Sequence, residues 1–167
     1  EFDLKKSINE IESTIKPLVE KNKNILKVEY KTELQKMSAD VTKVRQILLN
    51  LLSNSAKFTK EGTISISVED SKLQSDAIDF VISDSGIGMT KDQVEKVFKP
   101  FTQADEKTTR KFGGTGLGLT ITKMFAEMMG GDISLTSKEG KGTTFTTTIP
   151  LKVVDQKKRA EVELITQ

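Results

Sequence analysis

The stretch Lys43–Thr59, KVRQILLNLLSNSAKFT, decides how the rest of the 167-residue chain is arranged. Its apolar residues recur at the i, i+3, i+4, i+7, i+8 spacing of one helical face. They are Val44, Ile47, Leu48, Leu51 and Leu52. The spacing predicts an amphipathic helix that turns this face toward a core. Asp40 fits as its N-cap, and the helix is expected to end near Phe58.

Three polar side chains form a narrow stripe beside the apolar face. At about 100° per residue, Asn50, Asn54 and Lys57 fall on one side of the helix. Asn is a poor helix former in interior positions, so a helix that needs only solubility favours Glu and Lys there. Two interpretations stay open. The stripe is either ordinary polar residues at the margin of a core, or two carboxamides and an ammonium group held together for a ligand.

The composition narrows the classes of protein to which the chain can belong. Its 167 residues suffice for one domain with its own core, and 26 basic against 24 acidic residues give a net charge of +2. The absence of cysteine excludes disulfides and thiolate metal sites. The absence of histidine removes the commonest general base and metal ligand.

The same composition limits the partners. Basic residues are dispersed and aromatic residues are few, so a nucleic-acid partner is not expected. No apolar run approaches the roughly 20 residues of a membrane helix, and the chain does not open with a signal-peptide pattern. We therefore expect a soluble, cytoplasmic piece of a longer protein, without direct membrane contact. A membrane anchor elsewhere in the parent protein is compatible with this expectation.

The remaining segments read as further helices and strands. Apolar spacing predicts a helix from Phe2 to about Asn22 with an inward stripe, and a capping box at Thr90 and Gln93 predicts a short helix. Another helix is expected to start at Gly116 or Leu117. Its expected inward residues are Leu117, Ile121, Phe125 and Met128, and those of the first helix are Leu4, Ile8, Ile11, Ile15 and Leu18. Met124, Met128 and Met129 are interpreted as core filler.

Strand patterns occupy the other segments. Alternation of apolar and polar residues predicts strands at residues 25–30, 63–69, 78–84, 132–137 and 143–151. Adjacent strands favour an α+β fold, an α/β sandwich with a mixed, largely antiparallel sheet of about five strands. Because the strands alternate, three main helices are expected on one face only. Residues 1–151 are expected to form this domain, and residues 152–167 a charged tail or linker.

Asp84 is the second candidate site residue. It has the parity of the apolar residues of its strand, so it is expected to face inward at the strand's end. A buried carboxylate needs a donor, because burying it unpaired is costly. That donor is either the backbone of the turn at residues 84–86 or the amino group of a ligand. In the second case Gly86 and Gly88 let the backbone approach a flat ligand closely.

The third candidate is the glycine-rich segment GGTGLGL at residues 113–119, which leads into a helix. It matches neither the dinucleotide fingerprint nor a phosphate-binding P-loop. Backbone N–H groups at a helix start can bind an anion, although such a segment is as often a flexible turn. The long polar stretch at residues 102–111 favours a lid or binding loop. Arg110 is a candidate phosphate ligand, or with Lys111 part of a solvated charged loop; for Lys111 we prefer the latter.

Thr143 is a smaller signal. It has the parity of Phe145 and Ile149, so its hydroxyl group is expected to face inward. On the pattern alone, a hydrogen-bonded core threonine is the expected role.

Together these stretches resemble the ATP-binding catalytic domain of sensor histidine kinases. Their superfamily also holds gyrase-type topoisomerases, MutL and heat-shock chaperone ATPases. QILLNLLSNSAKFT (46–59) resembles the N box, DSGIGM (84–89) the first glycine box, FKPF (98–101) the F box and GGTGLGL (113–119) the second glycine box. GKGTTF (140–145) is similar to the motif that closes the nucleotide site. The motifs stand in family order and span Asp40 to about Leu151. The sequence around the second glycine box is most similar to that of hybrid kinases.

The resemblance implies ATP bound between the central helix and a flexible lid. Asp84 would accept a hydrogen bond from the adenine amino group, Phe58 would lie against the ring, and Asn54 would ligate Mg²⁺. Gly86, Gly88 and Thr143 belong to the same implied site. The phosphates would be held by Lys57, the backbone of Gly114, Thr115, Gly116, Leu117 and Gly118, and, in assisting roles, Asn50 and Arg110.

The resemblance also implies a reaction. In the ATPase branches a glutamate takes the place of Asn50 and activates water, which an amide cannot do. We therefore expect a protein histidine kinase domain whose phosphoacceptor histidine lies on a dimerisation domain outside this chain. A response regulator or receiver domain would act downstream, with the fragment monomeric and the parent kinase dimeric. The alternatives are a gyrase-type ATPase or clamp, and a nucleotide-binding scaffold without kinase activity.

Overall fold

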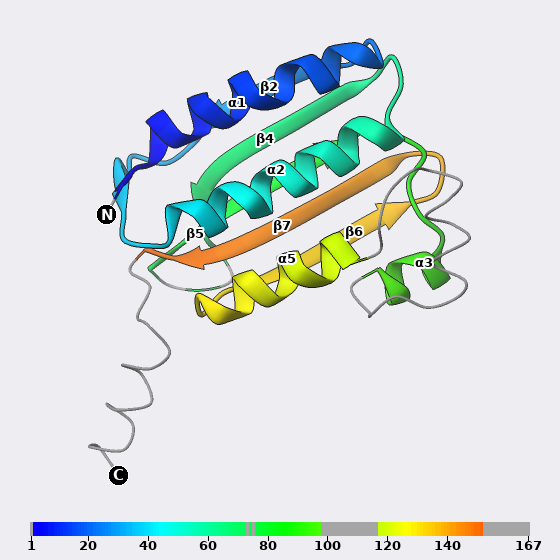
Figure 1. Ribbon diagram of the computed structural model, residues 1–167. Coiled ribbons are helices and arrows are strands. Elements are labelled where there is room, and N and C mark those ends of the chain that lie inside the picture. The colour runs from blue at the N-terminus through cyan, green and yellow to red at the C-terminus, as the bar shows by residue number, and fades with distance from the viewer. Residues whose placement is uncertain (1, 73, 75, 98–116, 152–167) are drawn as a thin grey trace.

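The computed structural model describes residues 2–72, 74, 76–97 and 117–151, whose arrangement Figure 1 shows. A five-stranded sheet runs in the order β2-β4-β5-β7-β6. β2 lies parallel to β4, and the other neighbours are antiparallel. The mixed, largely antiparallel sheet is therefore confirmed. Its strands are β2 (Ile25–Tyr30), β4 (Thr63–Asp70), β5 (Ala77–Asp84), β6 (Asp132–Lys138) and β7 (Gly142–Pro150).

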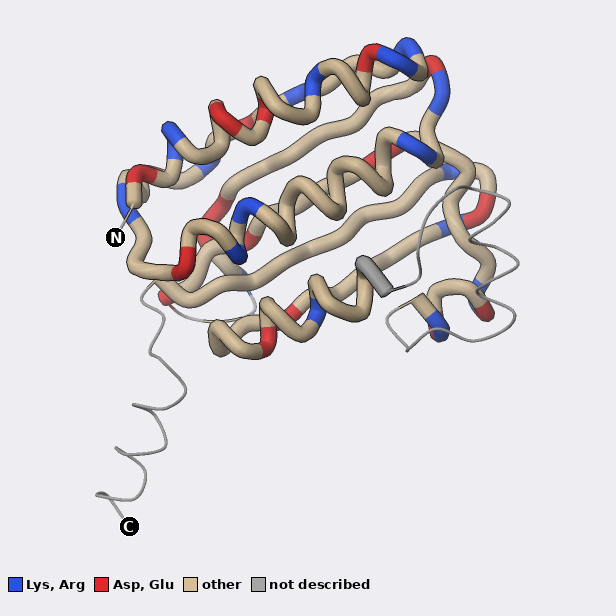
Figure 2. The backbone as a smooth tube through the Cα atoms, viewed as in Figure 1, with Lys and Arg blue, Asp and Glu red and all other residues tan. Residues whose placement is uncertain are grey.

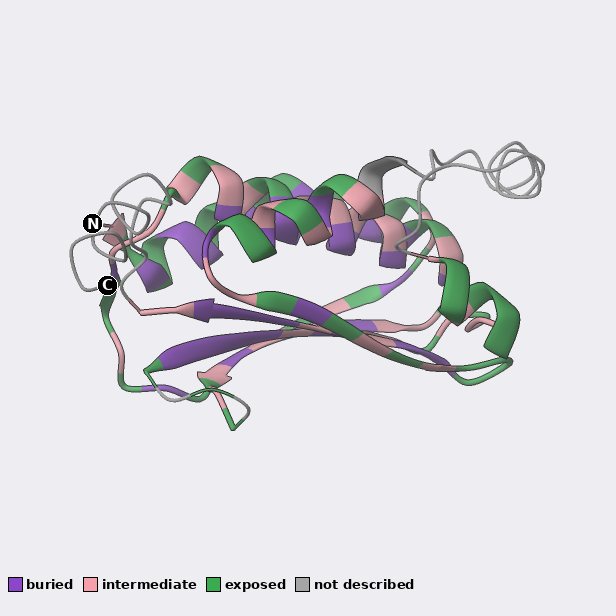
Figure 3. Ribbon diagram, turned by 90° about the horizontal axis from the view of Figure 1, so that it is seen from below, coloured by how far each residue is buried: buried purple, intermediate pink, exposed green. Residues whose placement is uncertain are grey.

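Three long helices lie on one face of this sheet, as expected (Figure 3). They are α1 (Leu4–Lys21), α2 (Val41–Phe58) and α5 (Leu117–Met128), with α2 in the middle (Figure 1). The short α3 (Lys91–Lys96) sits at one end of the sheet. Among the described residues the opposite face of the sheet carries no helix, so the fold is a two-layer sandwich.

The core forms between α2 and the sheet. All five apolar residues predicted for the inner face of α2 are at most 3% exposed. The helix begins as expected, because the Asp40 carboxylate accepts a hydrogen bond from the backbone N–H of Lys43 at 3.2 Å. This backbone hydrogen bond, with smaller contributions from the Lys43 ammonium group, lowers the pKa of Asp40 below its ordinary value.

Two short strands were not predicted. β1 (Phe2–Asp3) pairs antiparallel with β3 (Lys36–Met37). Strands of two residues are too short to show an alternating pattern, so the sequence offers no periodic signal for them. Asp3 is also the N-cap of α1 and accepts from the backbone N–H of Lys6 at 2.9 Å.

The last predicted core position of α1 was wrong. Leu18 is 40% exposed, whereas Val19 is 1% exposed. Both residues are apolar and both continue the helical spacing from Ile15, at i+3 and i+4. The pattern therefore did not distinguish them, and packing on the sheet selects Val19.

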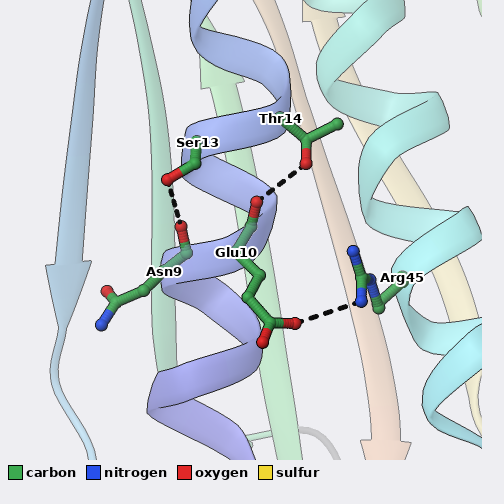
Figure 4. A network of polar contacts seen from close by, with 5 residues as sticks. All are labelled: Asn9, Glu10, Ser13, Thr14 and Arg45. Atoms are coloured by element: carbon green, nitrogen blue, oxygen red, sulfur yellow. Dashed lines mark hydrogen bonds and ion pairs between the residues drawn. The ribbon is translucent and has the colours of Figure 1, made fainter.

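The packing of α1 on α2 includes a polar contact at the surface (Figure 4). Glu10 accepts from Arg45 of α2 at 3.1 Å. Within α1, the hydroxyl groups of Ser13 and Thr14 donate to the backbone carbonyls of Asn9 and Glu10. Exposed ion pairs contribute about 0–1 kcal/mol, so buried apolar residues account for most of the contact. Charges of both signs occur along α1 (Figure 2).

The inner face predicted for α5 was partly wrong. Ile121 and Met128 are 45% and 41% exposed, and Met124 is 53% exposed. The buried residues are Thr122, Ala126 and Met129, with Phe125 half-buried. Apolar residues surround much of this helix, so the spacing did not single out one face. Of the three methionines interpreted as core filler, only Met129 is buried.

Several expectations lie outside the described residues. These are the flexible lid, the F box and the charged tail at 152–167. The described helices do not include one with the length and apolar character required to cross a bilayer.

Candidate functional site

Asn50, the first residue of the polar stripe on α2, contacts α5. The Asn50 amino group donates to the Thr122 hydroxyl of α5 at 2.6 Å, and Thr122 is 2% exposed. Asn54, one turn further along α2, is half-buried and forms no side-chain hydrogen bond with the other described residues. Lys57 is exposed and Phe58 is half-buried. Asn50 thus belongs to the contact between two helices, and Asn54 lies one turn further along the same helix.

The Asp84 carboxylate closes the turn at the end of β5. Its Oδ1 atom accepts from the backbone N–H of Gly86 at 3.0 Å and from that of Thr143 at 3.3 Å. Its Oδ2 atom forms no hydrogen bond with the described residues, and the side chain is only half-buried. A carboxylate has about four acceptor positions. The turn contact and a ligand contact are therefore compatible, since they use different oxygens.

The first glycine loop packs directly on the C-terminal end of α2. The backbone N–H of Ile87 donates to the carbonyl oxygen of Phe58 at 3.1 Å. A Cβ atom at Gly86 would collide with that same carbonyl, and one at Gly88 (φ +68°) would collide with the carbonyl of Lys138. The structure therefore requires glycine at both positions for contacts within the protein. The expected close approach of this loop to a ligand stays a prediction.

Ser137 is a candidate site residue that the sequence interpretation missed. Its Oγ accepts from the backbone N–H of Met89 at 2.8 Å and lies within hydrogen-bonding distance, 3.0 Å, of the Gly142 carbonyl oxygen. It also lies 2.8 Å from the Thr143 hydroxyl, which is buried as predicted. One signal could have revealed it. Ser137 ends the inward-facing row of β6 that begins with Ile133, just as Asp84 ends the inward-facing row of β5.

Part of the predicted site is outside the described residues. Arg110, Gly114, Thr115 and Gly116 belong to this group. α5 begins at Leu117, as expected, and Gly118 lies in its first turn. The phosphate-binding role of this segment stays a prediction.

Apart from Asn50 in the middle of α2, the described candidates gather at one end of the molecule. The C-terminal end of α2, the first turn of α5 and the β6–β7 turn lie at this end (Figure 1). Contacts join the Asp84 loop to Phe58 on one side and to Thr143 and Ser137 on the other. Carboxylate, carboxamide, hydroxyl and aromatic groups are thereby brought to one region from four elements of the fold.

An open cavity of about 370 Å³ lies beside this region. Neither Asn54 nor Asp84 lines it, so it is not the site that the two residues were predicted to share. Its lining residues are Ile87, Gly88, Thr90, Gln93, Glu139 and Gly140.

Comparison with known proteins identifies the family. Residues 39–153 match the family described as histidine kinase-, DNA gyrase B-, and HSP90-like ATPase. The chain therefore belongs to this ATPase family.

The relatives narrow the class. The autoinducer 2 sensor kinase/phosphatase LuxQ of Vibrio parahaemolyticus is 35% identical over 155 residues, which are 90% of this chain and 18% of that protein. Hybrid signal transduction histidine kinase B of Dictyostelium discoideum is 46% identical over 119 residues, which are 68% of this chain and 6% of that protein. The chain thus spans less than a fifth of either relative. Within the family it is an ATP-binding domain of the histidine kinase type.

Solved structures agree with the fold. Full-length ShkA in complex with AMPPNP superposes with a TM-score of 0.78 at 25% identity, over 92% of this chain and 31% of that one. The nucleotide-free catalytic domain of histidine kinase ThkA superposes with a TM-score of 0.74 at 26% identity, over 92% of this chain and 96% of that one. ThkA in complex with the response regulator TrrA superposes with a TM-score of 0.70 at 25% identity, over 90% of this chain and 41% of that one. The predicted α/β sandwich is confirmed.

Proposed function

We propose that this chain is the catalytic domain of a two-component sensor kinase. It binds ATP with Mg²⁺ and transfers the γ-phosphoryl group to a histidine on a dimerisation domain outside this chain. The observation that carries the proposal is the arrangement of Asp84. One of its oxygens accepts from the backbone N–H groups of Gly86 and Thr143. The loop that contains Gly86 packs against the end of the helix that bears Asn54.

The base-binding part of the site centres on Asp84 and Thr143. The Asp84 Oδ2 atom accepts from the adenine amino group, and Phe58 lies against the ring. Because backbone donors fix the other oxygen, the carboxylate is oriented before the nucleotide arrives, which lowers the entropic cost of binding. Lys57, Asn50, Arg110 and the 114–118 backbone serve the phosphates.

The described residues fit a magnesium ion that arrives with the nucleotide. They contain no cluster of three or more acidic or histidine side chains that could form a metal cage by itself. The Asn54 carboxamide, which has no hydrogen bond to other described side chains or backbone groups, offers one oxygen ligand. Mg²⁺ usually takes one or two protein ligands and completes its octahedron with phosphate oxygens and water. When bound there, the ion would supply positive charge that neutralises the charge developing on the transferred phosphoryl group.

The acceptor of the phosphoryl group lies elsewhere in the parent protein. The chain has no histidine. Asn50 stands where the ATPase branches of the family have a water-activating glutamate, and its carboxamide NH₂ donates a hydrogen bond to the Thr122 hydroxyl. An amide has no useful basicity near neutral pH, so water is a poor acceptor here. The fragment is monomeric and the parent dimeric. The ThkA–TrrA complex supports a response regulator or receiver domain as the next partner.

Two measurements test the proposal. The first is calorimetric titration of the chain with ATP, with and without Mg²⁺, where we expect binding that requires or is strengthened by the ion. The second is incubation of the full-length parent with γ-labelled ATP, where we expect an acid-labile, alkali-stable phosphate bond typical of phosphohistidine. Failure of the chain to bind millimolar ATP–Mg²⁺ would contradict nucleotide binding. Fast steady-state release of phosphate that Asn50→Ala abolishes would instead indicate a hydrolase.

The variant Asn54→Asp sharpens the magnesium assignment. Its side chain has nearly the same shape, so folding should persist. The added negative charge close to the phosphates and the changed ligand should reduce Mg²⁺-dependent phosphoryl transfer by about 100-fold, which corresponds to roughly 2.7 kcal/mol. Thermal unfolding of the variant provides the control. A variant that transfers phosphate at the parent's rate would overturn the role of Asn54.

A further inference from the structure

We infer that Ser137 is a positioning residue for base recognition, because its hydroxyl group sets the hydrogen-bonding role of Thr143. This inference rests on the proposed function, in which Thr143 faces the base beside Asp84. Ser137 itself acts through Thr143 and the first glycine loop.

The contacts of Ser137 come from three segments that surround the proposed base site. Its Oγ accepts from the N–H of Met89, in the first glycine loop, at 2.8 Å. On the other side it lies 3.0 Å from the carbonyl oxygen of Gly142 and 2.8 Å from the Thr143 hydroxyl oxygen. Ser137 therefore ties the first glycine loop to the β6–β7 hairpin.

The proton inventory of these groups allows two arrangements. A serine hydroxyl has one proton and two acceptor positions. The Met89 N–H occupies one acceptor position, so the proton goes either to the Gly142 carbonyl or to Thr143. In the first case Thr143 donates to Ser137 and offers a ligand only lone pairs. In the second case Thr143 accepts from Ser137 and its own proton is directed to a ligand.

The second arrangement matches the edge of adenine. Asp84 and Thr143 are directly opposed in the register of β5 and β7, and the N–H of Thr143 donates to Asp84. A carboxylate acceptor therefore stands beside a hydroxyl that can donate. Adenine presents an amino donor next to the acceptor nitrogen N1, whereas guanine presents an oxygen acceptor next to an N–H donor. If Ser137 donates to Thr143, the Thr143 hydroxyl can donate to N1, directly or through a water molecule. This arrangement thus favours adenine.

A purely structural role for Ser137 has to be separated from this one. The chain offers a matched control on the opposite face of the same sheet. Ser83 of β5 pairs with Thr144 of β7 through their hydroxyl groups at 2.9 Å. These two residues neighbour Asp84 and Thr143 in the sequence, but alternation along the strands turns them away from the helices. Removing the Ser83 hydroxyl breaks a similar pair without touching the base site.

The test measures base preference in variants of the whole chain. Calorimetry would compare ATP with 1-deaza-ATP, in which a carbon replaces N1, for the parent and for Ser137→Thr, Ser137→Val and Ser83→Ala. Threonine and valine have the same shape and differ in the hydroxyl group. One hydrogen bond corresponds to about a fivefold affinity difference. We expect the preference for ATP to persist in Ser137→Thr and Ser83→Ala, and to fall about fivefold in Ser137→Val.

Each outcome separates the two proposals. Equal preferences in Ser137→Thr and Ser137→Val, with ATP bound by the parent, would overturn the role of Ser137 and leave the proposed function standing. A similar loss in Ser83→Ala would also overturn it, because the effect would then come from sheet stability. A parent chain that does not bind ATP would overturn the proposed function itself. Ser137→Ala, which removes the hydroxyl without added bulk, repeats the test should Ser137→Val fail to fold.

Discussion

Two aspartates on the same strand have different hydrogen-bonding surroundings. Asp79 and Asp84 both lie on β5, and each is directly opposite a threonine of β7, Thr148 and Thr143 respectively. Asp79 is 5% exposed and accepts from the Thr148 hydroxyl at 2.6 Å. Asp84 is half-buried and accepts backbone N–H groups on a single oxygen.

The difference lies in which group donates. At Asp79 the threonine hydroxyl is the donor, so the two side chains are committed to each other. At Asp84 the threonine contributes only its backbone N–H, so the second carboxylate oxygen and the Thr143 hydroxyl are directed elsewhere. The number of residues between them turns the two aspartates to opposite faces of the sheet. We therefore interpret Asp79–Thr148 as a structural pair, while Asp84–Thr143 is the pair to which the proposed function assigns base binding.

The largest expected effect is that of Asp84→Asn. The amide keeps the shape of the side chain but loses the charged acceptor for the adenine amino group. Hydrogen bonds to charged groups contribute about 1.5–3 kcal/mol, so ATP affinity should fall roughly 10- to 100-fold and the preference for ATP over GTP should narrow. Calorimetric titration with both nucleotides measures this. A variant that binds ATP and GTP as differently as the parent does would show that Asp84 has another role.

Thr148→Val should produce the complementary result. The substitution conserves shape and leaves the Asp79 carboxylate without its hydroxyl donor, which should lower the free energy of unfolding by about 1–3 kcal/mol. ATP affinity should stay at the parent's value. Urea unfolding and calorimetry on the same preparation check both expectations. Weakened ATP binding at unchanged stability would reverse the assignment of the two pairs.

The smallest expected effect concerns a third carboxylate, Asp40, which also accepts a backbone N–H. Its pKa is lowered in the folded state, chiefly by the Lys43 hydrogen bond. Its contribution to stability is therefore fully present above the unfolded-state pKa and is lost as the pH falls through the lower folded-state pKa. Asp40→Asn, which keeps a capping side chain, should make the free energy of unfolding less dependent on pH in this acid range. Urea unfolding near neutral pH and at about pH 3 provides the comparison, and equal pH dependence in both proteins would remove Asp40 as the source.

The sequence predicted the layers of the fold better than its details. The α2 face was predicted correctly because its apolar residues form one narrow stripe with polar flanks. The α5 face was not, because apolar Ile121 and Met124 lie outside the stripe that contains buried Thr122. Helical spacing identifies a face only when the other sides are polar.

The candidate site was predictable by residue and not by partner. Asp84 was recognisable as a carboxylate at the end of an apolar row. Its pairing with Thr143 depends on the register of β5 and β7, which are separated by more than 50 residues in the chain and whose register no local pattern specifies. Ser137 was missed for the same reason. Its hydroxyl group is recognisable as a candidate only from its contacts with the Met89 N–H and the Thr143 hydroxyl, which the fold brings close to it.

The most direct test of the central claim is a crystal structure of this chain with AMPPNP and Mg²⁺. We expect a single nucleotide that spans the region between α2 and the end of β5. Its adenine amino group should lie within hydrogen-bonding distance of Asp84, and the metal ion on its phosphates should be bound by Asn54. A nucleotide seated elsewhere, or one that contacts only one of these two residues while side chains of the protein fill the space before the other, would contradict the account.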